Sequence, residues 1–194
     1  MKALGVLNLQ GGVVEHLDHL ERLGISARPV KEEADLQDLA GLIIPGGEST
    51  CLSRLLRIFA LDEVIKREFD RGMKIWGTCA GAILLSKDAR RAQPLLGLMD
   101  ITVARNAFGR QVDSFEADLD IPKLKQATGT KDPYHAVFIR APIIESVYGE
   151  VKVLASLPDK RIVAAQQGHL LATSFHPELT NDTRFHEYFL SLAD

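Results

Sequence analysis

A Gly-x-Cys-x-Gly turn between an apolar strand and a helix constrains the fold of this chain more than any other feature. The apolar segment 73–76 runs into Gly77-Thr78-Cys79-Ala80-Gly81, and a second apolar run follows at 82–85. A turn this tight needs small residues two positions before and after the nucleophile, because larger side chains would collide with the strand and the helix. The pattern predicts a nucleophile elbow with Cys79 at a helix N-terminus, where unpaired N–H groups and the helix dipole favour a thiolate.

The two cysteines leave an alternative open. Free cysteine is among the most buried residue types, so Cys79 could instead be a packing residue in a glycine-bounded turn. The strand before it and the two glycines favour the nucleophile. Cys51 has no such setting and is predicted to serve packing. No Cys-x-x-Cys or Cys/His spacing is present, so we expect neither a disulfide framework nor a metal site, and no cofactor.

The first half of the chain alternates short apolar runs with amphipathic ones. Helices are predicted to follow from Val13, Leu52 and Ala80, where apolar residues recur at helical spacing. Strands are predicted over 3–9, 25–30, 41–44 and 73–76. Strands that alternate with helices imply right-handed crossovers and a mostly parallel sheet covered on both faces.

The second half has a different pattern. From Asp100 to Ala172 the apolar runs are short, rich in β-branched residues and separated by turn signals, as at 101–103, 136–139 and 162–165. We expect these runs to be antiparallel additions to the sheet, followed by a helix over 183–192. A chain of 194 residues suits one hydrophobic core. The prediction is a single three-layer α/β domain over residues 1–194.

A nucleophilic cysteine needs a base and a group that orients the base. Of the six histidines, only His176 has a suggestive setting, Phe175-His176-Pro177-Glu178. Pro177 biases His176 away from helical geometry, and in extended backbone residues two apart project to the same side. Glu178 can then lie beside the imidazole and fix its tautomer, which predicts a Cys79-His176-Glu178 triad. Taken alone, the motif also fits a surface turn, and the cysteine elbow favours the triad.

An oxyanion site is predicted where the strand 41–44 ends in Pro45-Gly46-Gly47. Glycines at the carboxyl end of a parallel strand expose backbone N–H groups where α/β proteins bind ligands. The N–H groups of Gly47 and Ala80 are the expected donors, and Ser49 is expected to cap the next helix. The alternative for this segment is a tight loop without a ligand.

Composition and charge exclude several classes of protein. The chain is 46% hydrophobic with a net charge of -3 and has no basic run, so we expect no nucleic-acid partner and no anionic membrane surface. No stretch approaches the roughly 20 apolar residues that span a bilayer. The apolar opening segment is too short for a signal peptide. A cytoplasmic location is expected.

The elbow, Pro-Gly-Gly-Glu-Ser-Thr and Phe-His-Pro-Glu-Leu occur in this order, and the chain thereby resembles the class I, triad-type glutamine amidotransferases. Finer motifs resemble one branch, the glutaminase subunits of pyridoxal 5'-phosphate synthases, over essentially the whole chain. These motifs are Gly5 to Gly12, Glu15-His16, Ala104 to Gln111 and Phe138 to Pro142. Segment 123–135 departs from the pattern by being a few residues longer.

The resemblance implies hydrolysis of L-glutamine to L-glutamate and ammonia through a cysteine thioester. The ammonia would pass to a separate synthase subunit, within a large hetero-oligomer, that makes pyridoxal 5'-phosphate from ribose 5-phosphate and glyceraldehyde 3-phosphate. It further implies that Gln10 assists the oxyanion site once that subunit docks. The residues implied to hold glutamine are Gly47, Glu48, Ser49, Arg105, Ile139 and Arg140.

Other interpretations of these residues stay open. Arg105 and Arg140 could anchor the substrate α-carboxylate or form ordinary ion pairs within the protein. The scaffold could also serve a γ-glutamyl hydrolase or the glutaminase of a different synthase. A non-catalytic regulatory subunit is the alternative from another class, and the intact set of cysteine, histidine and carboxylate weighs against it.

Overall fold

The apolar strands of the first half pair side by side and parallel in the computed structural model, which describes residues 2–105 and 114–192. β1 (Ala3–Leu7) lies between β2 (Ala27–Val30) and β3 (Leu39–Ile44), and β4 (Lys74–Thr78) pairs with β3. β12 (Leu170–Thr173) pairs with the other side of β4, also parallel. The carboxyl ends of β1, β3, β4 and β12 therefore meet at one edge of the sheet, the usual place for a ligand site.

The remaining strands of this sheet are mostly antiparallel. β11 (Ile162–Gln167) is antiparallel to β12, to β9 (Ile143–Val147) and to β10 (Lys152–Ser156). β9 is antiparallel to β6 (Met99–Ala104), and β5 (Ser86–Asp88) ends the sheet parallel to β6. In the described residues the order is β2-β1-β3-β4-β12-β11-β9-β6-β5, with β10 beside β11. The predicted α/β fold with a mostly parallel sheet and antiparallel additions is confirmed.

One segment that was predicted to extend the main sheet does not join it. Segment 136–139 belongs to β8 (Tyr134–Ile139), which pairs with β7 (Ser114–Leu119) in a separate two-stranded sheet. The rings of Phe115 and Phe138 stack there at 4.4 Å between centroids. This two-stranded sheet packs its apolar side against the core instead of extending the main sheet. The long segment 123–135 holds most of an unpredicted helix.

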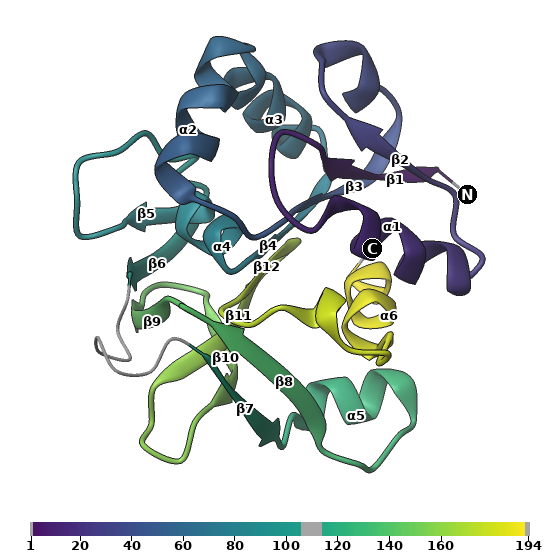
Figure 1. The fold of residues 1–194 in the computed structure, drawn as a ribbon, viewed down its shortest axis with the longest axis vertical. Helices are drawn as coiled ribbons and strands as arrows, with labels where there is room; N and C mark the ends of the chain where they lie inside the picture. Colours follow the sequence, from purple (N-terminus) through teal and green to yellow (C-terminus); the bar gives the residue numbers. More distant parts are fainter. Residues whose placement is uncertain (1, 106–113, 193–194) are drawn as a thin grey trace.

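Helices cover both faces of the main sheet, as Figure 1 shows. One face carries α1 (Val13–Arg22) and α6 (Arg184–Ser191), and α5 (Pro122–Thr128) packs against α6. The other face carries α2 (Ser49–Ile58), α3 (Leu61–Asp70) and α4 (Ala80–Leu85). Two short 3-10 helices, Glu33–Leu36 and Pro177–Leu179, complete the elements. Sequence patterns did not predict α3, although its residues Leu61, Val64 and Ile65 are buried.

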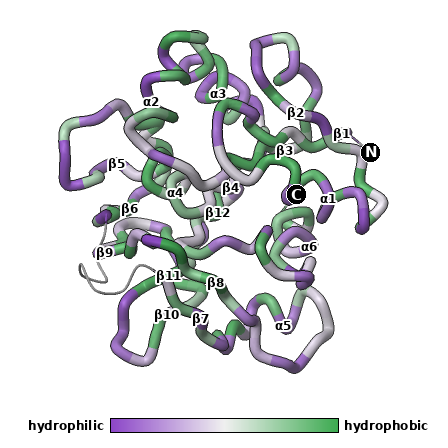
Figure 2. The backbone as a smooth tube through the Cα atoms, in the orientation of Figure 1, coloured by the Kyte–Doolittle hydropathy of each residue, from purple (hydrophilic) through white to green (hydrophobic). Residues whose placement is uncertain are grey.

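Alternation along the central strands divides the core into two layers. Leu42 and Ile44 of β3 face α2 to α4, whereas Ile43 between them faces α1 and α6. Figure 2 shows β3 largely in green, the colour of apolar residues, whereas the helices are of mixed hydropathy. The layer under α6 is aromatic and includes Trp76 of β4 and Phe185.

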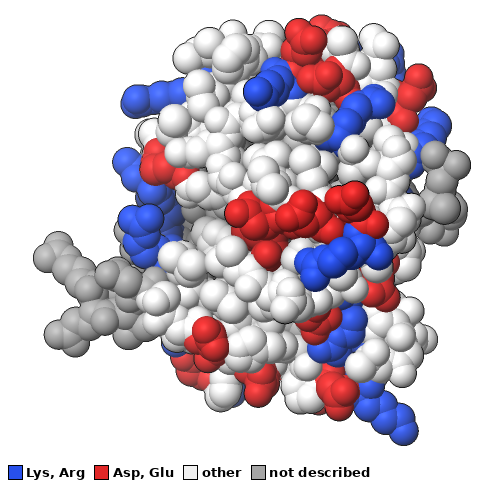
Figure 3. Space-filling view, turned by 45° about the vertical axis from the view of Figure 1, so that its right-hand side comes forward, with Lys and Arg blue, Asp and Glu red and all other residues white. Residues whose placement is uncertain are grey.

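Charged side chains of both signs lie on the surface. On the face seen in Figure 3, acidic side chains form a band across the middle, with basic side chains beside it and along the edges. Within residues 2–105 and 114–192, no helix is long and apolar enough to cross a membrane.

The aromatic layer predicts how stability depends on α6. Phe185 is fully buried, and its ring centroid lies 4.7 Å from that of Tyr134 and 5.1 Å from that of Phe175. Phe185→Ala leaves a cavity and should lower the free energy of unfolding by about 3–5 kcal/mol, measured by urea denaturation. Phe59→Ala, at a position 53% exposed, is the matched control and should change it by less than about 0.5 kcal/mol. Equal losses in both variants would contradict this packing.

Candidate functional site

The turn at Cys79 has the close approaches that its sequence pattern requires. Cys79 has φ +48°, a left-handed value that non-glycine residues rarely adopt, and it precedes α4 directly. A Cβ on Gly77 would lie 2.4 Å from the carbonyl of Gly81, and a Cβ on Gly81 would lie 2.0 Å from the oxygen of Ile44. Only glycine allows β4, α4 and β3 to pack this closely. The strained turn leaves Cys79 mostly buried beneath the sheet edge, 7% exposed.

Two parallel strands bring the histidine to the cysteine. The backbone N–H of Cys79 donates to the carbonyl of Thr173, the last residue of β12, at 2.8 Å. Three residues later, the N–H of His176 donates to the carbonyl of Val137 in β8, also at 2.8 Å. The His176 ring hydrogen-bonds to the Cys79 side chain. Gly46 makes the site compact, since a Cβ there would lie 2.6 Å from Cε1 of His176.

Glu178 orients the imidazole from the far side. His176 Nδ1 lies 2.8 Å from Oε1 of Glu178, and the carboxylate side chain is 2% exposed. Burial opposes protonation of His176, but its hydrogen bonds to Cys79 and Glu178 raise its pKa to about 10. Burial likewise acts against ionised Glu178, yet the hydrogen bond from His176 and the nearby His16 lower its pKa. The site therefore favours a protonated His176 ring, which lies between Cys79 and the ionised carboxylate of Glu178.

Backbone donors lie beside the cysteine. The N–H of Ala80, in the first turn of α4, has no acceptor within the helix. The carbonyl of Gly46 faces Gly11, since a Cβ on Gly11 would lie 1.8 Å from that oxygen. In a trans peptide the N–H of Gly47 points the opposite way, away from the turn after β1.

Gln10 holds the loop that follows β3. Its Oε1 accepts the N–H of Glu48 at 3.0 Å and lies 3.1 Å from where a Cβ of Gly47 would stand. Gly47 has φ +145°, which favours glycine. With its carbonyl engaged, the side chain of Gln10 has its amide N–H₂ left as a donor.

A cavity of about 450 Å³ opens in front of Cys79 and His176. Every residue predicted to hold glutamine or to form the oxyanion site lines it: Gln10, Gly47, Glu48, Ser49, Ala80, Arg105, Ile139 and Arg140. Glu178 lies behind His176 and does not line it. Ile83 and Pro142 line it as well and were not predicted, because apolar residues in a helix and a loop carry no distinctive signal.

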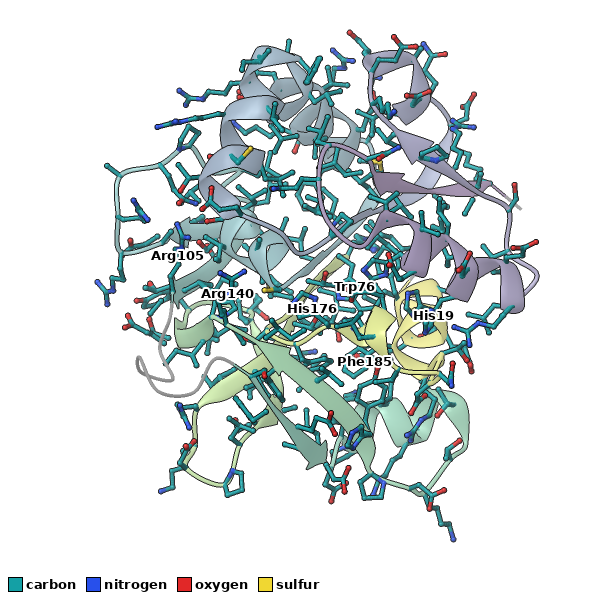
Figure 4. All side chains as sticks on the ribbon, in the orientation of Figure 1. His19, Trp76, Arg105, Arg140, His176 and Phe185 are labelled. Atoms are coloured by element: carbon teal, nitrogen blue, oxygen red, sulfur yellow. The ribbon has the colours of Figure 1, made fainter. Side chains whose placement is uncertain are left out.

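The two arginines have different surroundings. Arg105 donates to Oε1 of Glu48 at 3.0 Å and to Oγ1 of Thr50 at 3.1 Å. Arg140 has no acidic partner within salt-bridge distance among the described residues. In Figure 4 both arginines lie on one side of His176, with Trp76 and His19 on the other. Among the described residues, Arg140 is thus an arginine of the cavity wall whose charge has no acidic partner.

Several sequence expectations were wrong in detail. Glu48, not Ser49, caps α2: its carboxylate accepts the N–H groups of Thr50 and Cys51. Ser49 is instead the first residue of the helix and is buried. Cys51 is exposed and does not serve packing. Of the predicted motif Ala104 to Gln111, residues 106–111 lie outside the described residues.

The sequence of this chain is similar to that of known proteins. The profile of the SNO glutamine amidotransferase family matches residues 6–193. The chain is 56% identical to "Pyridoxal 5'-phosphate synthase subunit PdxT" of Herpetosiphon aurantiacus, over 97% of this chain and 99% of that protein. It is 52% identical to the protein of the same name from Desulforamulus reducens, over 97% and 98% of the two chains.

Solved structures agree with the fold. A "Crystal structure of glutamine amidotransferase" matches with a TM-score of 0.90 and 45% identity, over 98% of each chain. The "Structure of PurLQS from Thermotoga maritima" matches with a TM-score of 0.72 over 98% of this chain and 99% of that one. At 18% identity, the second match supports the fold alone.

The raised pKa of His176 predicts how Cys79 reacts with an electrophile. Because the imidazolium is retained up to about pH 10, its charge should stabilise the Cys79 thiolate at neutral pH. His176→Gln removes that charge, and alkylation of Cys79 by iodoacetamide should then be slower near neutral pH. Peptide mass spectrometry separates Cys79 from the exposed Cys51. Identical pH profiles for Cys79 in both proteins would refute the pairing.

Proposed function

The chain belongs to the SNO glutamine amidotransferase family, and from this membership we propose that it is the glutaminase subunit of a pyridoxal 5'-phosphate synthase. It hydrolyses L-glutamine to L-glutamate and ammonia and supplies the ammonia to the synthase subunit. The observation that carries the proposal is the hydrogen-bonded series Cys79, His176 and Glu178 beside a cavity of about 450 Å³. The single-domain organisation and the cytoplasmic location stay predictions.

The first half-reaction forms a thioester. The Cys79 thiolate attacks the carboxamide carbon of glutamine, and the N–H groups of Gly47 and Ala80 stabilise the oxyanion. The His176 imidazolium gives its proton to the departing nitrogen as the C–N bond breaks, which releases ammonia. The cavity supports this role because it brings the donors, the nucleophile and the acid together.

The second half-reaction restores the cysteine. His176, now neutral, takes a proton from water as that water attacks the γ-glutamyl thioester. Collapse of the tetrahedral intermediate breaks the C–S bond and frees glutamate, and the Cys79 thiolate pairs again with the His176 imidazolium. Glu178 holds the ring in one tautomer through both steps.

The two arginines of the cavity are proposed to serve the amino-acid end of glutamine. Arg140 lines the cavity without an acidic partner among the described residues, so it is proposed to bind the α-carboxylate. Arg105 already bonds Glu48, which caps α2, and is proposed to hold the loop of Glu48 and Ser49 against the substrate.

The proposal predicts opposite results for the two cysteines. Cys79→Ala should abolish glutamine hydrolysis while leaving the fold and glutamine binding intact, because the lost atom is the nucleophile and not a binding group. Cys51→Ala is the matched control, and its exposed side chain should leave turnover unchanged. Glutamate release and calorimetric binding measure these outcomes. Substantial hydrolysis by Cys79→Ala would refute the assignment.

Activity is also predicted to depend on the partner. Gln10 lies on the loop after β1 with its carbonyl bound to Glu48, so docking of the synthase subunit is proposed to complete the oxyanion site there. Glutamine turnover should be low for the isolated chain and should rise when the synthase subunit is added. Co-purification of the two subunits and glutamine-dependent formation of pyridoxal 5'-phosphate test the partnership. Equal turnover with and without the partner would exclude this activation.

A further inference from the structure

We propose that His16 is a positioning residue that holds the second oxygen of the Glu178 carboxylate, with His186 setting the tautomer of His16. The inference rests on the proposed function, because it assumes that Glu178 orients the catalytic base. It adds two histidines, one from α1 and one from α6, behind the triad.

The two oxygens of the Glu178 carboxylate face two different imidazole rings. Oε1 of Glu178 bonds His176, whereas Oε2 lies 3.4 Å from Nε2 of His16. Both atoms of the second pair are buried and have no closer partner in the described residues. A buried carboxylate is costly unless both of its oxygens are compensated, and a small approach of the two side chains closes a normal hydrogen bond. His16 is thus the donor positioned for Oε2.

His186 determines which nitrogen of His16 carries the proton. Nδ1 of His16 lies 2.9 Å from Nε2 of His186. When His186 donates through Nε2–H, Nδ1 of His16 accepts and the single proton of His16 sits on Nε2, facing Glu178. The reverse arrangement would aim a lone pair of His16 at the carboxylate and leave an N–H of His186 buried without a partner among the described residues. The first arrangement avoids both penalties.

Burial keeps both histidines neutral, as this arrangement requires. Burial lowers the pKa of His16 to about 4, against the effect of Glu178, and His19 and His176 lower it further. Burial also holds the pKa of His186 well below its usual range, with added repulsion from His16, His19 and Arg22. The contact with Glu178 is consequently one between a neutral ring and a carboxylate, and not an ion pair.

Aromatic packing fixes the two rings in place. Trp76 of β4 meets the ring of His16 edge-on at 5.7 Å and the ring of His186 edge-on at 5.0 Å. His19 stacks on the outer side of His186 at 4.5 Å. His16 does not line the substrate cavity, so its effect on catalysis passes through Glu178.

Two substitutions of His16 separate hydrogen bonding from packing. His16→Gln places an amide N–H where Nε2–H stood, whereas His16→Leu fills the space without a donor. Without the donor, the pKa of Glu178 should rise, and the carboxylate should then hold the proton of His176 less strongly. The titratable groups around Glu178 in this test are His16 and Glu15 of α1, His176, and Tyr134 of β8.

The experiment measures glutaminase kinetics with the synthase subunit bound, together with the pH midpoint of Cys79 alkylation. For His16→Leu we expect kcat to fall about 10–100-fold with KM nearly unchanged, as for other partners of catalytic groups. The alkylation midpoint should move to higher pH. His16→Gln should restore both quantities to near the wild-type values. Thermal denaturation is the control that both variants are folded.

Two results would overturn the inference. One is a His16→Leu protein with wild-type kcat and midpoint, and the other is an equal loss in His16→Leu and His16→Gln, which would mean packing alone. Failure of the proposed function gives a different result. The wild-type complex would then not hydrolyse glutamine, while the alkylation midpoint, which needs no glutamine, would still report the role of His16.

Discussion

The buried carboxylate of Glu178 is the interaction on which the site depends. A carboxylate so far from water stays ionised only if its neighbours compensate for lost hydration, and it then holds a proton on His176. The nitrogen that carries this proton lies 2.8 Å from the carboxylate oxygen, and the charged ring favours the thiolate of Cys79. Glu178, His176 and Cys79 thus stabilise one another in their charged forms. We do not expect any of the three to keep its charge without the other two.

The fold supports this arrangement through parallel strands with close contacts. β3, β4 and β12 are neighbours and end at the same edge, so Gly46, Cys79 and His176 follow three adjacent strands. Glycines at positions 46, 77 and 81 let backbone and rings approach to distances that a side chain would forbid. β4 carries Trp76 on the face covered by α1 and α6, where His16 lies beside the carboxylate and His186 lies behind His16.

The sequence predicted the parts of the site whose signals are local. The elbow depends on five consecutive residues and Glu178 on its spacing from His176, so both could be inferred from the order of residues alone. Features set by distant packing could not. His16 and His186 are 170 positions apart, and no local pattern joins them.

The same limit applies to elements. Helix α5 and the strand pair β7 and β8 lie in a stretch of short β-rich runs, where only tertiary packing decides which strands join the main sheet. Glu48 displaced Ser49 as the helix cap because its longer side chain folds back onto the N–H groups of Thr50 and Cys51. The two arginines proposed to line the substrate site were inferred from the family resemblance, because Arg140 has no distinctive sequence context.

The most direct test of a thiolate activated for glutamine is labelling with a diazo-ketone analogue of glutamine. The analogue is added to the complex with the synthase subunit, and labelled peptides are mapped by mass spectrometry with and without excess glutamine. We predict a covalent adduct on Cys79 that glutamine prevents, and none on the more exposed Cys51. A label on Cys51 with Cys79 unmodified, or labelling of Cys79 that glutamine does not slow, would contradict the account.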